Sequence, residues 1–245
     1  MPFTFSHPAI VLPFYYLPKK TRSMTGLVIG SMVPDFEKFF RMSHYDGFSH
    51  TWPAIFYFNL PLAILLSFAF HQVARNSLID NLPLFLKKRL LPYKQFNWLR
   101  YFKNHYLVII LSILVGVVSH LTWDSLTHPG GQLFELFPIL SKWIRYPGFH
   151  MWLYVLIDRI SSVIGGLVIV VAILKLPTYF IPHQADSKSS SYWLFMGLII
   201  LIIMSLRLLI GVDAKFFVMD VLITLISASL WSLIVTPYFL KFYKN

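Results

Sequence analysis

Five long apolar runs constrain the fold of this 245-residue chain more than any other feature. Each has about 20 predominantly apolar residues, the length that an α-helix needs to cross the hydrocarbon core of a bilayer. That core holds no water to bond the backbone, so each run must satisfy its own N–H and C=O groups as a helix. The runs lie at roughly 52–72, 105–126, 151–174, 192–211 and 217–240. The sequence therefore predicts an all-α polytopic membrane helix bundle, with about five transmembrane helices plus short N-terminal and interfacial helices.

The composition agrees with a membrane protein and excludes some kinds of site. Hydrophobic residues make up 57% of the chain and charged residues only 13%, against about 25% charged residues in soluble domains. No cysteine is present, which excludes disulfides and thiolate metal ligands. The formal charge of +11 is explained by basic loops facing anionic headgroups, since no nucleic-acid recognition motif accompanies it. We expect membrane lipids as partners and no nucleic acid.

No internal repeat divides the chain, so residues 1–245 are predicted to form a single membrane domain. Its expected parts are an N-terminal site-forming segment at 1–51, a three-span core at 52–174, a linker at 175–191 and two C-terminal spans at 192–245. The stretch at 127–150, rich in Pro, Gly and aromatic residues, predicts an ordered lid or an interfacial hairpin. The first residues lack the basic region and cleavage site of a signal peptide, so we expect the N-terminus to be retained.

The distribution of Lys and Arg gives the expected topology. Eleven lie on the side of loop 74–104, and eight lie on the side of residues 1–51. The excess favours loop 74–104 on the cytoplasmic side, and hence a site on the non-cytoplasmic side of a bacterial inner membrane. In either orientation, the single span after residue 51 places the N-terminal segment on the same side as the C-terminal end of the second span.

That end of the second span carries the motif SHLTWDSLTHPGG at 119–131. On a helix, His120 and Asp124 are separated by one turn and share a face. His128 lies within roughly 80° of the same stripe if the helix continues that far. Pro129 and the following glycine pair then predict the end of the helix. Ionisable groups in a membrane span are costly and are usually paired or functional.

Further candidate ligands come from the N-terminal segment, on the same side of the membrane: His7, Asp35, His44, Asp46 and His50. Without thiolates, His and Asp ligands suit one or two divalent ions, zinc first, with manganese or iron as alternatives. Each residue also has a structural explanation. Asp35 could cap a helix, the loop histidines could be interfacial, and a His120–Asp124 hydrogen bond could be purely structural. Arg159 could clamp a phosphate or snorkel, Arg207 is expected to snorkel, and Asp220 has no obvious partner.

Four motifs in order resemble the bacterial membrane family called domain of unknown function 4184: MPFTFSHPAIVLP, LVIGSMVPDFEKFF, FSHTW and SHLTWDSLTHPGG. The resemblance covers residues 1 to about 170. The family looks like a distant relative of the membrane-bound metal-dependent hydrolases regulated by LexA, and its order of motifs is similar to that of zinc-dependent phospholipase C.

The resemblance implies metal ligation by His7, His50, His120, Asp124 and His128, with Asp35 as the catalytic carboxylate that positions or deprotonates water. Residues expected around them, in a supporting or substrate-binding role, are His44, Asp46, Thr127 and Arg159. The phospholipases have a later His-x-x-x-Glu that this chain lacks, since Tyr154 follows His150 at that spacing. That difference favours one or two metal ions over three.

Two functions of different class remain open on the sequence. The first is a membrane-bound metal-dependent hydrolase of a phosphoester or other lipid-linked substrate. The alternative is a non-enzymatic scaffold or transporter-like protein whose His/Asp cluster is structural or binds protons or metal. Few spans, no inverted repeat and a cluster at one membrane surface favour the first.

Overall fold

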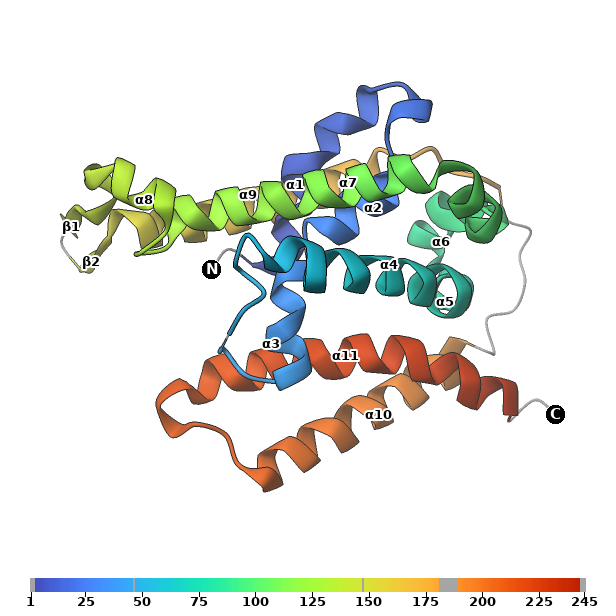
Figure 1. The fold of residues 1–245 in the computed structure, drawn as a ribbon. Coiled ribbons are helices and arrows are strands. Elements are labelled where there is room, and N and C mark those ends of the chain that lie inside the picture. The colour runs from blue at the N-terminus through green and yellow to red at the C-terminus, as the bar shows by residue number, and fades with distance from the viewer. Residues whose placement is uncertain (1–2, 46, 147, 181–188, 243–245) are drawn as a thin grey trace. The chain divides into compact units, whose positions relative to one another are not determined.

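The computed structural model describes residues 3–45, 47–146, 148–180 and 189–242. Within these residues the regular secondary structure is helical apart from one short hairpin (Figure 1). Five helices are long and apolar enough to cross a membrane, at Ile55–Asn81, Trp98–Thr127, Leu153–Leu174, Ser189–Ile210 and Ala214–Lys241. They confirm the predicted all-α, multi-pass membrane bundle.

The elements follow one another in a simple order. The α-helices are α1 (Pro8–Val11), α2 (Met24–Gly30), α3 (Phe36–Arg41), α4 (Leu60–Ala69), α5 (Arg75–Asn81), α6 (Leu84–Leu90), α7 (Trp98–Thr127), α8 (Gln132–Leu136), α9 (Leu153–Leu174), α10 (Ser189–Ile210) and α11 (Phe217–Phe242). Two strands, β1 (Trp143–Tyr146) and β2 (Phe149–Trp152), lie between α8 and α9. Short 3-10 helices, including η1 (Thr4–Ser6) and η4 (Val33–Asp35), join the N-terminal elements.

The chain divides into two compact units by its internal contacts. The first unit comprises Met1–Asp35, Phe48–Ile64 and Phe102–Lys175, and the second comprises Phe36–Gly47, Leu65–Tyr101 and Leu176–Asn245. Of the predicted linker at 175–191, residues 181–188 lie outside the described residues, and the last three belong to α10.

Glycines set the packing of α2 against α7 in the first unit. A Cβ added at Gly26 would lie 2.9 Å from the carbonyl oxygen of Ile109, and one at Gly30 would overlap the carbonyl of Ile113. Gly116 of α7 is equally close to the backbone of α2, at Leu27. The small-xxx-small spacing in α2 therefore gives the close helix approach expected of it.

The first membrane helix is longer than the predicted run at 52–72. A π-helical segment, Ile55–Asn59, precedes Pro61. Proline has no backbone N–H to donate, and the wider turn of the π-helix adjusts the backbone to the missing hydrogen bond. A second one, Phe70–Ala74, leads into α5. The charged Arg75 continues the helix because its guanidinium is buried and donates to His71 Nδ1 at 2.9 Å and to the carbonyl of Phe96 at 2.8 Å.

The stretch at 127–150 forms the expected hairpin. Strands β1 and β2 are antiparallel, with Trp143 opposite Trp152. The two indole rings pack edge to face with their centroids 4.7 Å apart, an arrangement that stabilises cross-strand pairs. Strand β2 runs directly into α9, so the hairpin fixes the start of that helix.

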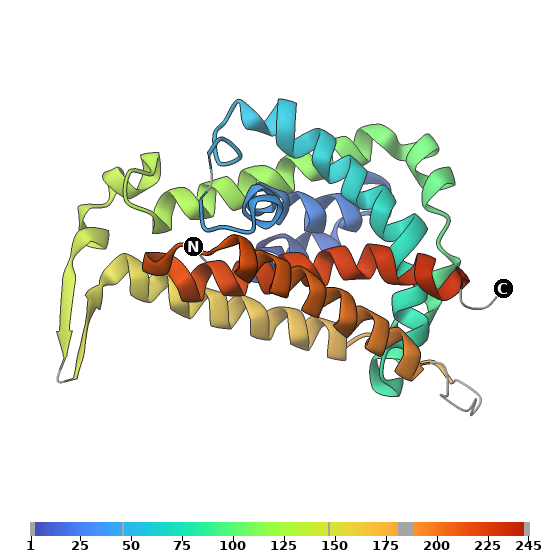
Figure 2. The same cartoon turned by 90° about the horizontal axis from the view of Figure 1, so that it is seen from below.

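In the second unit α10 and α11 lie side by side (Figure 2), and α3 packs on α11. Asp220 of α11 is buried, and one of its oxygens accepts hydrogen bonds from the backbone N–H of His44 and from His44 Nδ1, both at 2.8 Å. Sequence reasoning identified no partner for Asp220, and the structure shows that His44 is one. Arg207 of α10 donates to the carbonyl oxygens of Met42 and Gly211, so backbone acceptors satisfy this membrane cation.

Candidate metal centre

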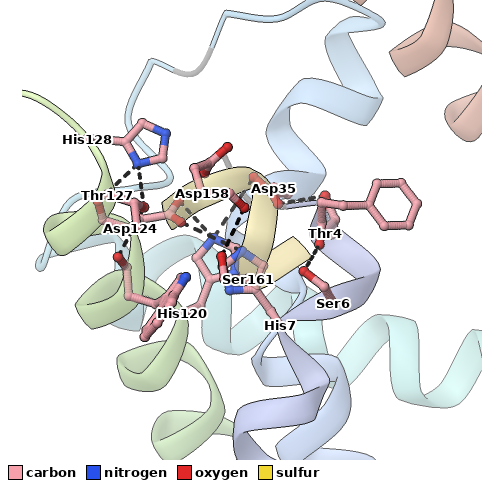
Figure 3. A network of polar contacts seen from close by, with 12 residues as sticks. Thr4, Ser6, His7, Asp35, His120, Asp124, Thr127, His128, Asp158 and Ser161 are labelled. Carbon is pink, nitrogen blue, oxygen red and sulfur yellow. Dashed lines mark hydrogen bonds and ion pairs between the residues drawn. The ribbon is translucent and has the colours of Figure 1, made fainter. Parts of the chain in front are cut away.

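Five predicted site residues converge within the first unit, from four separate segments. His7 lies between η1 and α1, where Pro8 occupies the first helical position. Asp35 ends η4, directly after Pro34. His50 belongs to the turn that precedes the first membrane helix, and His120 and Asp124 lie one turn apart on α7 (Figure 3). The convergence agrees with the predicted placement of the N-terminal segment and this end of α7 on one side of the membrane.

Four of these side chains form a group that could hold a metal ion. Asp35, His50, His120 and Asp124 each offer one ligand atom, and these atoms lie within 4.8 Å of one another. His50 Nε2 lies 3.4 Å from Asp35 Oδ1, 3.4 Å from Asp124 Oδ2 and 3.3 Å from His120 Nε2. His120 Nε2 lies 3.3 Å from Asp124 Oδ2 and 4.0 Å from Asp35 Oδ1.

These separations fit a small divalent ion. Nitrogen and oxygen ligands bind zinc at about 2.0–2.1 Å, which places neighbouring ligands of a tetrahedral ion about 3.3 Å apart. Four of the five distances given above are 3.3 or 3.4 Å. Two imidazoles and two carboxylates also form a donor set that zinc, manganese and iron accept.

In three of these side chains, the nitrogen or oxygen atom that faces away from the group has a hydrogen-bond partner. That partner orients the other nitrogen or oxygen atom of the same side chain toward the group. His120 Nδ1 lies 2.8 Å from the carbonyl oxygen of Ser31. A carbonyl can only accept, so Nδ1 carries the proton and the Nε2 lone pair faces the group. His50 Nδ1 lies 3.0 Å from Ser49 Oγ. Thr4 Oγ1 donates to Asp35 Oδ2 at 2.6 Å, which leaves Asp35 Oδ1 toward the histidines (Figure 3).

His7 lies beside this group of four. Its ring stacks on that of His120 with centroids 3.9 Å apart, and its Nε2 lies 3.7 Å from Asp124 Oδ1. Burial, and then the neighbouring His120, lower the pKa of His7 from 6.5 to about 3, so its imidazole is neutral at neutral pH. Among the described residues, neither ring nitrogen of His7 nor Asp124 Oδ1 has a hydrogen-bond partner. Such buried polar atoms cost about 1–3 kcal/mol each when unsatisfied, and a metal ion could satisfy Asp124 Oδ1 and the one His7 nitrogen that carries no proton.

His128 lies apart from the four. Helix α7 ends at Thr127, one residue earlier, and Gly130 then takes a positive φ of 84°. His128 Nδ1 lies 3.0 Å from the carbonyl oxygen of Asp124 and 3.2 Å from Thr127 Oγ1. Thr127 is buried, and its hydroxyl donates to the carbonyl of Trp123. These two residues surround the helix end that carries Asp124, and their roles remain predictions.

The structure describes two of the three remaining candidates. His44 pairs with Asp220 in the second unit, Asp46 falls outside the described residues, and Arg159 is exposed on α9. Sequence reasoning missed Thr4, Ser31 and Ser49, which hold the outer atoms of the group. All three lie in quoted motifs, but only Ser49 is directly beside a candidate ligand, His50, whereas Thr4 and Ser31 are three and four positions before His7 and Asp35.

The fold and the site together define a polytopic membrane protein with a buried His/Asp group that could bind a metal ion at one end of a membrane helix. The family model described as "Domain of unknown function (DUF4184)" matches residues 1–238, and the chain belongs to that family. No curated protein and no solved structure matches the chain. The expected distant relation to LexA-regulated hydrolases and to zinc-dependent phospholipase C remains a prediction.

Proposed function

We propose that this protein is a membrane-bound metal-dependent hydrolase that cleaves a phosphoester or another lipid-linked substrate, with one or two zinc ions as the first choice of cofactor. The observation that carries the proposal is the group of four ligand atoms within 4.8 Å of one another. A purely structural His–Asp pair would need only His120 and Asp124. The presence of Asp35 and His50 at the same point favours a metal ion.

The exposure of the group supports a reactive site over a closed structural one. The side chains of Asp35 and His120 are 1% and 0% exposed, whereas that of His50 is 20% exposed. The group is therefore accessible on the His50 side. Structural zinc sites are closed four-ligand sites, commonly rich in cysteine, and catalytic sites keep a position for water or substrate.

In this proposal the residues of the site have different roles. A bound divalent ion supplies a Lewis acid that acidifies water and stabilises charge on a phosphoryl oxygen. His50, His120 and Asp124 would hold the ion, and His7 or His128 would complete its coordination or hold a second one. Asp35 Oδ1 would accept the proton that water loses as its oxygen bonds to phosphorus. The P–O ester bond breaks, and the proton held by Asp35 would pass to the leaving ester oxygen.

Metal analysis of the detergent-purified protein tests the site. We expect the wild type to carry one or two divalent ions per chain by mass spectrometry, and His120→Ala and Asp124→Ala to lose them. His150→Ala is the matched control, because His150 is an exposed histidine on β2. If the wild type carries no stoichiometric metal, or if the two variants retain it, the metal site is wrong.

Hydrolysis is tested separately, on a panel of phosphomonoesters, phosphodiesters and phospholipids. We expect turnover that a chelator abolishes and that added zinc or manganese restores. A protein that binds metal but leaves the whole panel intact with added divalent ions would favour the non-enzymatic alternative, a scaffold or transporter-like protein.

A further inference from the structure

A mainly apolar groove of about 450 Å³ lies in the first unit. It lies next to the metal-site group, which consists of Asp35, His50, His120 and Asp124. One wall consists of η1 and α1, with His7, Ala9 and Ile10, and the other consists of α9. Gly165 allows these walls to meet, because a Cβ there would lie 2.8 Å from the carbonyl oxygen of Ser6. The groove is large enough for a small-molecule ligand, which needs about 300–1,000 Å³.

One face of α9 supplies the long wall of the groove. Its lining residues repeat at the three- and four-residue spacing of a single helix face: Ile157, Ile160, Ser161, Ile164, Gly165 and Val168. At 1.5 Å per residue this face is about 17 Å long. The hydrocarbon core of a bilayer is about 30 Å thick, so the groove spans about one leaflet. That is the depth of a single acyl chain.

The groove is continuous with the metal-site group through His7. His7 lines the groove and stacks on His120. The polar side chains that line the groove are those of Ser6, His7 and Ser161, together with the indole of Trp123. Figure 3 shows Ser6, His7 and Ser161 close together. The remaining lining is almost wholly aliphatic. A ligand with a long apolar part and a polar end matches this arrangement.

The surroundings of α9 identify the source of that ligand. Helix α9 is a candidate membrane span with a mean hydropathy of 2.1, and only 6% of that window is buried. The open side of the groove belongs to this apolar, exposed surface, at Ile160 and Ile164. In a bilayer such a surface faces acyl chains and no water.

We infer that this groove holds one acyl chain of the lipid substrate and thereby places the ester at the head of that lipid beside His7 and the metal-site group. This inference rests on the proposed hydrolase function and names its substrate class: a membrane lipid with a long acyl chain, recognised from within the bilayer.

The test fills the groove without touching a proposed metal ligand. Ile164→Trp places an indole in the groove, and Val163→Trp is the control. The two positions are adjacent on α9 and similarly exposed, at 55% and 63%, but only Ile164 lines the groove. Both variants should fold alike and retain the wild-type metal content.

The first readout is photocrosslinking in nanodiscs with a phospholipid that carries a diazirine in its acyl chain. We expect labels in residues 6–10 and 157–168 of the wild type and of Val163→Trp. Labelling of these segments in Ile164→Trp should fall about tenfold, the effect of about 1.4 kcal/mol of lost binding. Equal labelling of both variants would overturn the inference. A change in oligomeric mass of Ile164→Trp with unchanged labelling would also overturn it, in favour of a second copy of the chain as occupant.

The second readout is hydrolysis, which separates the groove from the catalytic proposal. The rate at which Ile164→Trp hydrolyses a long-chain lipid should be about tenfold lower than that of the wild type. Its rate on a short-chain, water-soluble substrate with the same head group should be unchanged. Equal losses on both substrates would contradict the groove and leave the hydrolase intact. If the wild type hydrolyses nothing, the hydrolase proposal fails, and the crosslinking alone decides the groove.

Discussion

At the residue scale, the two oxygens of Asp35 have different surroundings. Oδ2 accepts a short hydrogen bond from Thr4 Oγ1, and Oδ1 lies 3.4 Å from His50 Nε2. A carboxylate fixed at one oxygen can direct the other with little freedom. Oδ1 is therefore placed either to bind a metal ion or to take a proton from water, and one substitution separates these roles.

Asp35→Asn removes the base but keeps an oxygen that can bind a metal. If Asp35 acts as the general base, the variant should keep its bound metal while its hydrolytic rate falls about 10²–10⁴-fold, the usual contribution of a general base. Metal content and rate on the same preparation give the result. Loss of the metal from Asp35→Asn would make Asp35 a ligand instead.

Thr4→Val tests the hydrogen bond behind Asp35 and preserves the side-chain shape. Loss of a supporting hydrogen bond typically costs about 10–100-fold in activity or metal affinity. Because Asp35 is the proposed base, we expect the hydrolytic rate of Thr4→Val to fall by about that factor while its metal content stays unchanged. Thr21→Val is the control, since its exposed hydroxyl donates only to the carbonyl of Pro18. An unchanged hydrolytic rate in Thr4→Val would mean that Thr4 does not support Asp35, and a loss of metal would make Asp35 a ligand.

Local spacing predicted only part of this constellation. The His120–Asp124 pair follows from helical geometry, and Asp35 and His50 followed from motif resemblance and the same-side topology. Thr4 and Asp35 are 31 positions apart, and Ser31 and His120 are 89 apart. Such contacts depend on how η1, η4 and α7 pack, which no local pattern encodes. His44 shows the converse, because it resembled a site residue and instead bonds Asp220, 176 positions away.

At the element scale, the site depends on how closely α2 approaches α7. Gly116 precedes His120 by about one turn, and a Cβ there would lie 2.7 Å from the backbone nitrogen of Ser31. The carbonyl of Ser31 in turn orients His120. The absence of a side chain at Gly116 therefore positions both the helix pair and the imidazole of His120, a candidate metal ligand.

Gly116→Ala should disturb both the packing of α2 on α7 and the position of the His120 imidazole. We expect a lower melting temperature in detergent, because overpacking a tight contact costs about 1–3 kcal/mol, and weaker metal binding. Gly166→Ala is the matched control, since a Cβ at Gly166 on α9 meets nothing within 4 Å. It should be neutral or stabilising, as alanine exceeds glycine in a helix by about 0.5–1 kcal/mol. Equal melting temperatures for the two variants would contradict the packing argument.

At the scale of the whole molecule, the sequence predicted the number of membrane spans correctly but predicted the residues at which they begin and end less accurately. The second predicted span began at 105, whereas α7 begins at Trp98 and passes through a non-helical φ of −136° at His105. The first predicted span ended at 72, whereas the helix continues to Asn81 because buried Arg75 finds backbone and histidine acceptors. Hydropathy identifies the apolar part of a helix but gives no information on the polar contacts that extend the helix beyond it.

The topology gives the last prediction. The chain lacks cysteine, so single cysteines can be introduced without a background. Tyr15→Cys and Ile139→Cys lie at exposed positions on the side of the site, and Phe85→Cys lies at an exposed position in the basic loop between the first two spans. An odd number of spans separates Phe85 from each of the other two.

A membrane-impermeant maleimide should label Tyr15→Cys and Ile139→Cys in intact cells and Phe85→Cys only after permeabilisation, because the excess of Lys and Arg favours the cytoplasm for loop 74–104. The opposite pattern would reverse the orientation and place the site on the cytoplasmic side, with the metal group unchanged. If Tyr15→Cys and Ile139→Cys were labelled under different conditions, His7 and Asp124 could not meet, and the candidate metal centre would be wrong along with the topology.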